Sequence, residues 1–433
     1  MSTTVEAIAA RLQGYDPNSM RTDAVLQFLE QLVQPVSGTE QVGVFDALDR
    51  VLAQDLVSPI SVPPHDNSAM DGFAFDGRAL PAQTLTLQVT GTALAGQPWQ
   101  GTVGPGPALR IMTGGVMPSG LDTVVPQELV QQEGDTIRFE AGTLTRGDNR
   151  RLLGEDLLQG RAALRQGDRL GPAALGLVAS LGIAQVTVWR RPTIAYFSTG
   201  SEILSLGEAP RPGAVYDSNR YTVFGMLRRL GLDVLDLGVV PDEPAALEQA
   251  YRTAAARADA IITSGGVSVG EADHTRAMMQ QLAGPGGGIA FWRIAMRPGR
   301  PMAVGHIAAD GAPGARSALL FGLPGNPVAV MVTFLAFVRP ALLRLMGCNA
   351  MAPPRLRAHS LEAMRKKPGR TEYQRGIVTT TAGGRLQVRT TGNQGSGVLR
   401  SMVQANGLIV LGHDQGHVAP GDEVDVMMFD GVL

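Results

Sequence analysis

Short apolar runs typical of strands alternate with segments typical of helices between about residues 192 and 340. The runs are "TIAYFS", "DVLDLGVV", "DAIITSGG" and "SALLFGLPG", and helical segments begin near Asp217 and Glu243. This alternation favours a mainly parallel sheet, because each parallel connection needs a crossover that covers a face of the sheet. Ligands of such sheets bind beyond the carboxyl ends of the strands. We therefore predict a doubly wound α/β domain with a ligand site at that edge.

The remainder of the 433-residue chain is too long to join this core, so we expect several domains. Short alternating runs predict a small β-domain from about 60 to 148 and a β-barrel after about 350. Helical patterns from Asp23, in "VFDALDRVLAQDLVSP" and from Pro172 to Gly182 flank the β-domain, which is therefore an insertion. The predicted domains are a helical region 1–60 discontinuous with 149–190, an inserted β-domain 61–148, the α/β domain 191–348 and the C-terminal β-barrel 349–433.

Composition limits the classes of partner. A formal net charge of -2 gives no broad attraction for nucleic acid or an anionic membrane, although it allows a local basic site. The single cysteine, Cys348, excludes an internal disulfide framework and an all-cysteine zinc site. The first residues, "MSTTVEAIAARLQG", lack the apolar core of a signal peptide, and no uninterrupted apolar run reaches spanning length. We expect a cytoplasmic protein that binds neither nucleic acid nor membrane.

Glycines and acids follow the strand-like runs of the α/β domain in "STGSE" (198–202), "VVPDEP" (239–244) and "TSGGVSVGEADHT" (263–275). Glycines let the backbone approach a ligand, and exposed amides after a strand can bind a phosphate, although a plain turn is the alternative. Glu202, Asp242 and Asp273 would then surround a phosphate site, where Mg²⁺ resolves their repulsion of the ligand. Each acid alone could instead cap a helix, and we favour capping for Asp217.

The string "FWRIAMRPGRP" (291–301) contains three arginines. Arg293 and Arg297 are four residues apart, so in one strand both would project from the same face. The planar guanidinium fork of arginine suits oxyanions, and a solvated or salt-bridged edge is the alternative. His274 has no second histidine or cysteine at a spacing typical of metal ligands. The string therefore predicts either an oxyanion site or a salt-bridged edge, and His274, in "GEADHT", is interpreted as a polar surface or pocket residue.

Seven strings occur in the order "DNSAMDGFA", "IMTGG", "GED", "STGSE", "SGGVSVGEADHT", "MRPGRP" and "GLPGNP". This set spans nearly the whole chain and resembles the molybdopterin molybdenumtransferase family, which comprises the MoeA proteins and the E domain of gephyrin. The resemblance implies an enzyme of molybdenum cofactor biosynthesis that inserts molybdate into adenylylated molybdopterin and releases AMP in a Mg²⁺-dependent step. It also implies a homodimer with the active site at the subunit boundary, and four regions: helical linker, inserted β-domain, molybdopterin-binding α/β domain and C-terminal barrel.

The resemblance also implies roles for individual positions. The catalytic residues would be Asp71, Thr113, Asp156, Glu202, Asp242 and Asp273, of which the last three would also hold the metal. Those that bind substrate or molybdate would be Ser198, Thr199, Gly200, Gly265, Gly266, Ser268, Arg293, Arg297, Arg300, Pro324, Pro327, Arg370 and Ser396. In "DNSAMDG", Asn67 and Ser68 would bond the loop backbone so that Asp71 faces the partner subunit. Relatives often have lysines where the three arginines of "FWRIAMRPGRP" stand.

Two other functions compete with this one. A molybdopterin adenylyltransferase resembles the α/β domain alone, whereas a carrier or scaffold would hold molybdopterin without turnover. Release of AMP that depends on both molybdate and Mg²⁺ distinguishes the transferase from a carrier. Partners would be the adenylyltransferase and the molybdoenzyme acceptors, and molybdate and tungstate, which are close in shape and charge, both stay candidate oxyanions.

Overall fold

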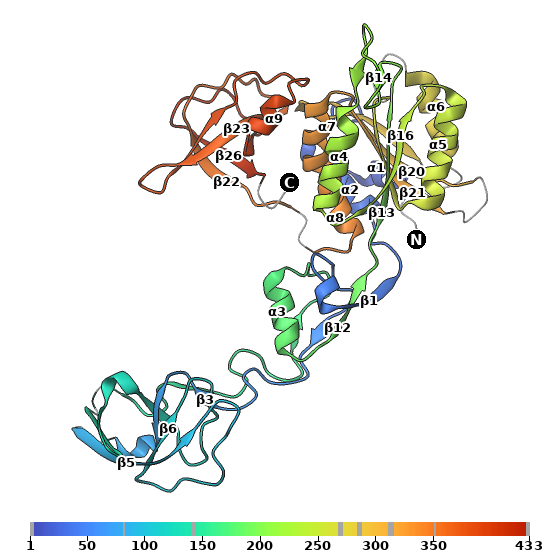
Figure 1. Ribbon diagram of the computed structural model, residues 1–433. Coiled ribbons are helices and arrows are strands. Elements are labelled where there is room, and N and C mark those ends of the chain that lie inside the picture. The colour runs from blue at the N-terminus through green and yellow to red at the C-terminus, as the bar shows by residue number, and fades with distance from the viewer. Residues whose placement is uncertain are drawn as a thin grey trace.

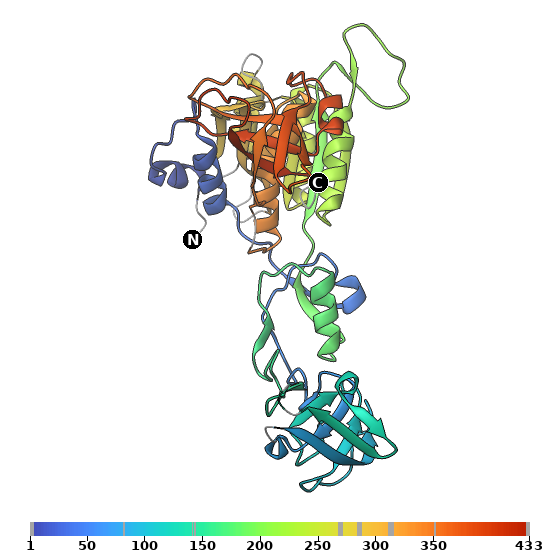
Figure 2. The same ribbon diagram turned by 90° about the vertical axis from the view of Figure 1, so that its left-hand side faces the viewer.

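The computed structural model describes residues 4–80, 83–140, 142, 144–266, 272–283, 288–310, 316–349 and 352–429 of the 433-residue chain. Figures 1 and 2 show an elongated molecule. An α/β unit and a small barrel lie side by side at one end, a β-domain forms the other end, and a narrow linker joins them. This arrangement confirms the predicted class, a multidomain fold of α/β and β parts.

A six-stranded sheet of order β16-β13-β17-β21-β20-β18 forms the centre of the α/β unit. Its first four strands are parallel, whereas β20 runs antiparallel to both β21 and β18. Successive side chains of a strand point to opposite faces, so Tyr196 enters one core and Phe197 the other. The strands are β13 (Thr193–Thr199), β16 (Asp233–Val240), β17 (Ala260–Ser264), β18 (Ile289–Arg293), β20 (Pro301–Ala308) and β21 (Ser317–Leu323).

Helices cover both faces of this sheet (Figure 1). One face carries α5 (Pro244–Arg257) and α6 (Ala272–Leu282). The other face carries α4 (Ser218–Arg229), α7 (Pro327–Thr333) and α8 (Arg339–Leu345), with a π-helical turn at Phe334–Val338. The capping role predicted for Asp217 is confirmed, because a carboxylate oxygen of Asp217 accepts a hydrogen bond from the Arg220 amide at 3.0 Å.

The stretch Pro327–Leu345 is long and apolar enough to cross a membrane if only length and composition are considered. In the protein, 78% of the most apolar 18-residue segment of this stretch is buried, and its residues belong to the main core of the α/β unit. The length and apolarity of this helix are therefore explained by its place in the core.

The N-terminal helices α1 (Val5–Arg11) and α2 (Thr22–Leu32) pack against the α/β unit. Phe28 of α2 is fully buried, and its ring meets that of Trp292 edge-on with centroids 4.9 Å apart. The sequence predicted that residues 1–60 and 149–190 form one helical region. Residues 5–32 instead pack against the α/β unit, because the apolar face of α2 is covered by the sheet and α8. Helix α2 starts after Arg21, so Asp23 lies in its first turn and is not the cap.

Two distant segments paired strand to strand form the linker. The pairs are β1 (Thr39–Gly43) with β12 (Gln185–Trp189) and β2 (Leu56–Val57) with β11 (Ala162–Leu164). A third pair, β3 (Asn67–Ser68) with β10 (Arg150–Arg151), lies where the two segments enter the β-domain. Helix α3 (Pro172–Ser180) starts with a proline and is followed by Gly182 at φ +71°, as predicted. The helix predicted in 44–59 is wrong: only Val44–Asp46 forms a 3₁₀ turn, and the extended residues after it pair with the returning segment.

The inserted β-domain is a six-stranded sheet of order β7-β4-β6-β5-β9-β8. Gly72 starts β4 where the backbone of β7 is so close that a Cβ would collide with the Val125 carbonyl. Glycine is required at this position, directly after Asp71, because no side chain fits. The strands are β4 (Gly72–Phe75), β5 (Thr84–Ala93), β6 (Ala108–Ile111), β7 (Thr123–Pro126), β8 (Gln131–Glu133) and β9 (Thr136–Glu140).

The C-terminal region is a closed five-stranded barrel, as predicted. Strands β23 (Thr371–Thr380), β24 (Leu386–Thr390), β22 (Leu356–Ser360), β26 (Glu423–Met428) and β25 (Gly407–Leu411) pair in this order, and β25 pairs again with β23 to close it. A two-residue strand of the α/β unit, β19 (Met296–Arg297), adds in parallel to β23, with Arg297 opposite Glu372. The barrel is thus hydrogen-bonded to the string that carries the arginines.

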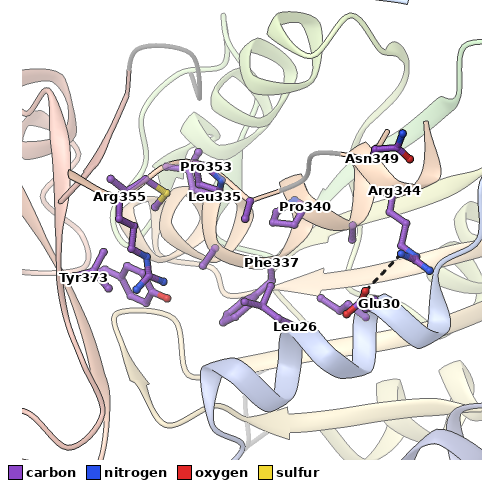
Figure 3. A pocket seen from close by; sticks show the side chains of 16 residues that line it. Leu26, Glu30, Leu335, Phe337, Pro340, Arg344, Asn349, Pro353, Arg355 and Tyr373 are labelled. Carbon is purple, nitrogen blue, oxygen red and sulfur yellow. Dashed lines mark ion pairs between the residues drawn. The ribbon is translucent and has the colours of Figure 1, made fainter. Parts of the chain in front are cut away.

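An apolar cavity of about 510 Å³ remains elsewhere between the barrel and the α/β unit (Figure 3). Leu26 and Phe337 line it from the α/β unit, and Tyr373 lines it from the barrel. The Arg344 guanidinium lies 3.9 Å from the Glu30 carboxylate on one side of this cavity. The two units are therefore in close contact at β19 but packed incompletely here.

Two leucines of α2 test whether the N-terminal helices belong to the α/β core. Leu29 is 3% exposed and Leu26 is 37% exposed, so Leu29→Ala should lose far more buried contact than Leu26→Ala in the same helix. We expect Leu29→Ala to lower the free energy of unfolding by about 2–5 kcal/mol and Leu26→Ala by less than about 1.5 kcal/mol. Urea unfolding followed by tryptophan fluorescence measures both, since Trp292 lies in this core. Equal effects would contradict the assignment of α2 to the core.

Candidate functional site

The carboxyl ends of β13 and β17 lie against each other at one edge of the α/β sheet. Gly265, after β17, has φ +91°, and a Cβ there would collide with the Thr199 carbonyl at the end of β13. Gly200 has φ +149°, and a Cβ there would lie 2.8 Å from the Glu202 carboxylate oxygens. The glycines of "STGSE" and "TSGG" therefore let the two loops and the Glu202 side chain come close together.

Three buried hydroxyl groups fix these strand ends. The Tyr196 hydroxyl lies 2.7 Å from Ser264 Oγ and 2.9 Å from Ser198 Oγ, and the two serine oxygens are 3.2 Å apart. Burial raises the pKa of Tyr196 well above its usual value, so the phenol stays protonated. Ser198, predicted to bind ligand, therefore uses its side chain to hold β13 and β17 in register beneath the edge.

The start of α4 supplies two polar groups at the same edge. Asp217 is 4% exposed, and its second carboxylate oxygen has no hydrogen-bond partner among the described residues. Asn219 donates its side-chain amide to the Gly325 carbonyl at 2.7 Å, which ties α4 to the "GLPGNP" loop, while its amide oxygen lacks a partner in the same described set. Sequence reasoning gave Asp217 only a capping role and missed Asn219, although both stand in "YDSN" directly after a glycine-containing turn.

The predicted metal ligands follow three adjacent strands. Glu202 and Asp242 are exposed on the loops after β13 and β16, and Asp273 lies in the first turn of α6, after β17. These parallel strands end at one edge, so the three positions share it. Of the side chains described, no group of three or more His, Cys, Asp or Glu is arranged to hold a metal ion. The Asp273 side chain and all of Ser268 lie outside the described residues, so both stay predictions.

A cleft of about 440 Å³ lies between the α/β unit and the barrel, next to this edge. It gathers residues from strings that are far apart in the sequence. Arg297 and Arg300 come from the "MRPGRP" turn, and Pro324 comes from the loop after β21. Arg370 and Ser396 come from two loops of the barrel. Five of the positions predicted to bind substrate or oxyanion therefore line one cleft, and Pro327 starts α7 directly beside it.

Positive charge predominates in this cleft and in two cavities that share residues with it. One cavity, of about 350 Å³, shares Arg300 and Arg370 with the cleft and adds Lys367. The other, of about 300 Å³, shares Arg297 and adds Arg365, Arg375 and two acids, Glu362 and Glu372. Six cationic side chains therefore face two carboxylates in the described residues of these three spaces. Such a region favours an anionic ligand.

Arg293 does not share the cleft with Arg297 and Arg300. The strand predicted to run through "FWRIAMR" is broken, since β18 ends at Arg293 and β19 starts at Met296 in a different sheet. Arg293 is exposed at the end of β18 and lines none of the three spaces described above. The expected common face is wrong, because the chain leaves one sheet to join the other between the two arginines. Gly299 makes this turn possible: it has φ +94°, and a Cβ there would collide with Thr333 Oγ1 of α7.

The second predicted group lies in the β-domain. One carboxylate oxygen of Asp71 accepts hydrogen bonds from the amide and the hydroxyl of Thr113, both at 2.7 Å. These bonds lower the pKa of Asp71, with the amide as the larger cause, so the carboxylate stays ionised. Ser68 bonds its own loop, as predicted: its hydroxyl donates to the Met70 carbonyl at 2.5 Å and accepts from the Met70 amide at 3.2 Å. Asn67 is buried with its amide oxygen unpartnered among the described groups.

Asp156 lies near this loop but does not contact it directly. Its amide donates to the Val62 carbonyl at 3.1 Å, on the linker segment that leads into the Asp71 loop, and its side chain is exposed. Figures 1 and 2 show how far this end is from the α/β sheet: β3 and β6 lie in the β-domain, and the linker separates them from β13 and β16. Within one chain, Asp71 and the strand-end acids cannot act on the same atom.

Comparisons with known proteins match most of the length of the chain. Residues 20–182 match the MoeA N-terminal region (domain I and II), 195–344 a probable molybdopterin binding domain, and 357–429 the MoeA C-terminal region (domain IV). A molybdopterin molybdenumtransferase of Haemophilus influenzae is 40% identical over 94% of this chain and 98% of its own, and one of Nostoc is 35% identical over 90% and 88%. The crystal structure of a molybdopterin biosynthesis moeA protein from Pyrococcus horikoshii has a TM-score of 0.78 at 25% identity, covering 95% of this chain and 100% of its own.

The contact between Asp71 and Thr113 can be tested by titration. Thr113→Val removes the hydroxyl donor but keeps the backbone donor, so the pKa of Asp71 should rise part of the way to its ordinary value. The control is Thr145→Val, which removes the equivalent hydroxyl bond to Asp148 in the same β-domain. This control should raise the pKa of Asp148 and leave that of Asp71 unchanged. Carboxyl ¹³C chemical shifts followed against pH measure both, and an unmoved Asp71 in Thr113→Val would contradict the geometry.

Proposed function

We propose that this chain, which belongs to the molybdopterin molybdenumtransferase family, inserts molybdate into adenylylated molybdopterin and releases AMP. Members of this family are transferases of molybdenum cofactor biosynthesis. The observation that carries the proposal is the cationic cleft, which lies beside the carboxyl edge of a molybdopterin-binding-type sheet. An oxyanion and a phosphorylated pterin would then be held next to each other. The reaction needs this proximity, because metal insertion joins the two substrates.

The cleft supplies donors suited to a tetrahedral oxyanion. Arg297, Arg300 and Arg370 can each present N–H groups to separate oxygens, and Ser396 adds a hydroxyl. Arg370 is already oriented, because its Nε donates to the Glu372 carboxylate at 2.8 Å. That carboxylate neutralises only one of the three guanidinium charges. A net positive charge therefore stays available for molybdate.

The carboxyl edge of the sheet would hold the phosphate end of the pterin substrate. The backbones of Thr199, Gly200, Gly265 and Gly266 lie at the ends of β13 and β17. The Gly265 amide donates to the Leu323 carbonyl at 3.2 Å, so the amides of Gly200 and Gly266 would approach the phosphate oxygens. The bond from Asn219 to Gly325 places this edge next to the loop that lines the oxyanion cleft. The two substrates would therefore meet between α4 and the "GLPGNP" loop.

We propose that Mg²⁺ binds at this edge through one or two carboxylates together with the substrate phosphates, because the described acids form no cluster of three ligands. Glu202 and Asp242 offer exposed carboxylates after adjacent strands, Asp273 stands after the next strand, and Asp217 has a buried oxygen without a partner among the described residues. When bound, Mg²⁺ would neutralise phosphate charge while the link between the pterin phosphate and AMP breaks. The acids themselves would hold the metal and keep the phosphates in line with the oxyanion cleft.

We propose further that the protein is a homodimer. The elongated shape keeps Asp71, Thr113 and Asp156 away from the strand-end acids of their own chain, so a second copy must supply them if they act there (Figure 2). Tyr221 and Phe224 support such contact: they lie three residues apart on α4 and are 46% and 47% exposed. An ionised Asp71 from the partner could then accept a proton or orient a substrate hydroxyl at the edge.

The rival functions have less support. An adenylyltransferase corresponding to the α/β unit alone leaves the β-domain and barrel unexplained, whereas the transferases from Haemophilus influenzae and Nostoc align over both. A carrier would need the cationic cleft less than an enzyme that joins an oxyanion to the pterin. We also propose a cytoplasmic location and contacts with the adenylyltransferase that supplies the substrate and the molybdoenzymes that accept the product. The buried Cys348, whose pKa burial raises to about 11, is consistent with a reducing compartment.

AMP release from adenylylated molybdopterin tests the function directly. The wild-type protein should release AMP only when molybdate and Mg²⁺ are both present, and tungstate in place of molybdate tests oxyanion preference. Arg300→Ala removes charge-assisted bonds of about 1.5–3 kcal/mol, so the KM for molybdate should rise about tenfold or more. Arg293→Ala, in the same string but outside the cleft, should keep the wild-type KM. A wild-type protein without molybdate-dependent AMP release would reject the proposal and favour the carrier.

Mixed dimers test the shared site. Asp71→Asn and Asp242→Ala chains should each be nearly inactive alone. After random exchange of equal amounts, half of the dimers are mixed, and each has one site with both residues intact, so activity should recover to about one quarter of wild type. Native mass spectrometry confirms the exchange. If activity does not recover in verified mixed dimers, Asp71 acts within its own chain or outside the chemistry.

A further inference from the structure

Two cations of the barrel, one of which lines a cavity beside the cleft, are almost completely buried. Arg375 on β23 is 1% exposed, and Lys366, shortly before β23, is 2% exposed. Arginine and lysine are rarely buried so completely without a carboxylate partner, because desolvation of a charge is costly. Yet the hydrogen bonds that these two side chains make within the described chain go only to a hydroxyl and to backbone carbonyls. The charge of each is therefore not neutralised by a direct ion pair there.

The guanidinium of Arg375 holds the loop that precedes α9. Its Nε donates to Ser401 Oγ at 3.0 Å, and one terminal nitrogen donates to the carbonyls of Gly395 at 3.0 Å and Asn393 at 3.3 Å. Gln394, between those two residues, accepts a bond from the Arg375 amide at 2.8 Å and returns one to the Arg375 carbonyl at 3.2 Å. Three consecutive loop residues are thus bound to one residue of the barrel wall.

The next residue of this loop, Ser396, lines the oxyanion cleft. The Ser396 carbonyl accepts a hydrogen bond from the Val328 amide in the first turn of α7 at 3.1 Å. The loop therefore bridges the barrel and the "GLPGNP" side of the cleft, and its position follows from the Arg375 bonds. Arg375 itself reaches the neighbouring cavity that Arg297 also lines.

Lys366 holds the second loop of the barrel in a similar way. Its ammonium group donates to the carbonyls of Gln415 at 2.8 Å, Lys367 at 3.3 Å and His413 at 3.4 Å. The Gly369 amide donates to the same His413 carbonyl at 2.9 Å. This fixes the turn that leads into Arg370, the barrel arginine of the cleft. Each buried cation therefore supports one of the two loops that form the barrel side of the site.

We propose that Arg375 and Lys366 are positioning residues for the oxyanion: they fix the Ser396 and Arg370 loops and leave their own charge to be balanced by the anion. The inference rests on the proposed function, since it concerns the same cleft. Its physical basis is that a bound dianion adds negative charge near two cations that make no direct ion pair among the described residues, while their hydrogen bonds hold the loops before the ligand arrives. Burial, and then the charge of Arg297, lowers the pKa of Arg375 to about 10, which still leaves it charged at neutral pH.

Four variants test the proposal through molybdate dependence of AMP release. Arg375→Met and Lys366→Met should each raise the KM for molybdate about tenfold or more, while the rate at saturating molybdate changes less than about threefold. Arg375→Lys keeps the charge but cannot reach Ser401 and both loop carbonyls together, so its KM should rise about threefold or more. Arg339→Met is the control: Arg339 is 6% exposed in the α/β core and lines none of the three cationic spaces. Its KM for molybdate should match the wild type.

Hydrogen exchange without any ligand gives a second measurement that does not depend on turnover. Arg375→Met and Arg375→Lys should speed amide exchange at 393–396 and leave 367–370 unchanged, whereas Lys366→Met should do the reverse. The proposal would be overturned if a folded Arg375→Lys or Arg375→Met variant kept the wild-type KM and the wild-type exchange rate at 393–396. It would also be overturned if the Arg375 variants and Arg339→Met lost kcat and molybdate affinity to the same extent. If the methionine variants do not fold, Arg375→Lys decides by the same two measurements. A wild-type protein that releases no AMP rejects the proposed function instead, and the exchange pattern still tests the positioning.

Discussion

The pairing of β19 with β23 is the contact on which the candidate site depends. These two residues of the α/β unit add to the barrel and thereby set Arg297 opposite Glu372 and bring the "MRPGRP" turn next to the barrel loops. The turn can pass between the barrel and α7 only because Gly299 has no side chain to meet Thr333. Without this short parallel pairing the arginines would lie on an open edge of the α/β unit. With it they become one wall of a cleft whose other wall is the barrel.

Electrostatics then decide what this cleft can hold. Cationic side chains outnumber acids around it, and two positive groups buried in the barrel, Arg375 and Lys366, make hydrogen bonds but no direct ion pair among the described residues. Buried, unbalanced positive charge destabilises the empty protein, because the lost hydration is only partly replaced. The same arrangement favours an anion that brings the missing charge. On the proposed function, the protein would exchange some stability for affinity at this place, as preorganised binding sites do.

The second constraint is the shape of the chain. The linker is made of two paired segments, so the β-domain is held away from the sheet whose edge carries Glu202 and Asp242. The Asp71 carboxylate nonetheless accepts two hydrogen bonds from Thr113, which keep it ionised. The next residue, Gly72, lies so close to the backbone of β7 that no side chain fits there, so the backbone beside Asp71 is held in place. A carboxylate prepared in this way but kept far from the other acids has a chemical use only if another molecule is brought to it. A second copy of the chain is the molecule that we propose for this role.

The sequence by itself determined the domain types and singled out five of the residues that line the cleft. Alternating strand and helix patterns predicted the doubly wound sheet, and short alternating runs predicted the barrel, because both depend on periodicity within each segment. The sequence motifs and their family resemblance single out five residues of the cleft, and the tertiary structure brings them together. They are Arg297, Arg300, Pro324, Arg370 and Ser396. Tertiary structure alone decided that α2 joins the sheet, that 44–59 is extended, and that Arg293 is excluded by a change of sheet. It also decided that one carboxylate oxygen of Asp217 is buried without a partner among the described residues, and that Arg375 hydrogen-bonds the loop before Ser396. These tertiary features depend on which distant segment packs against a given face or hydrogen-bonds a given carbonyl, and local sequence patterns do not carry that information.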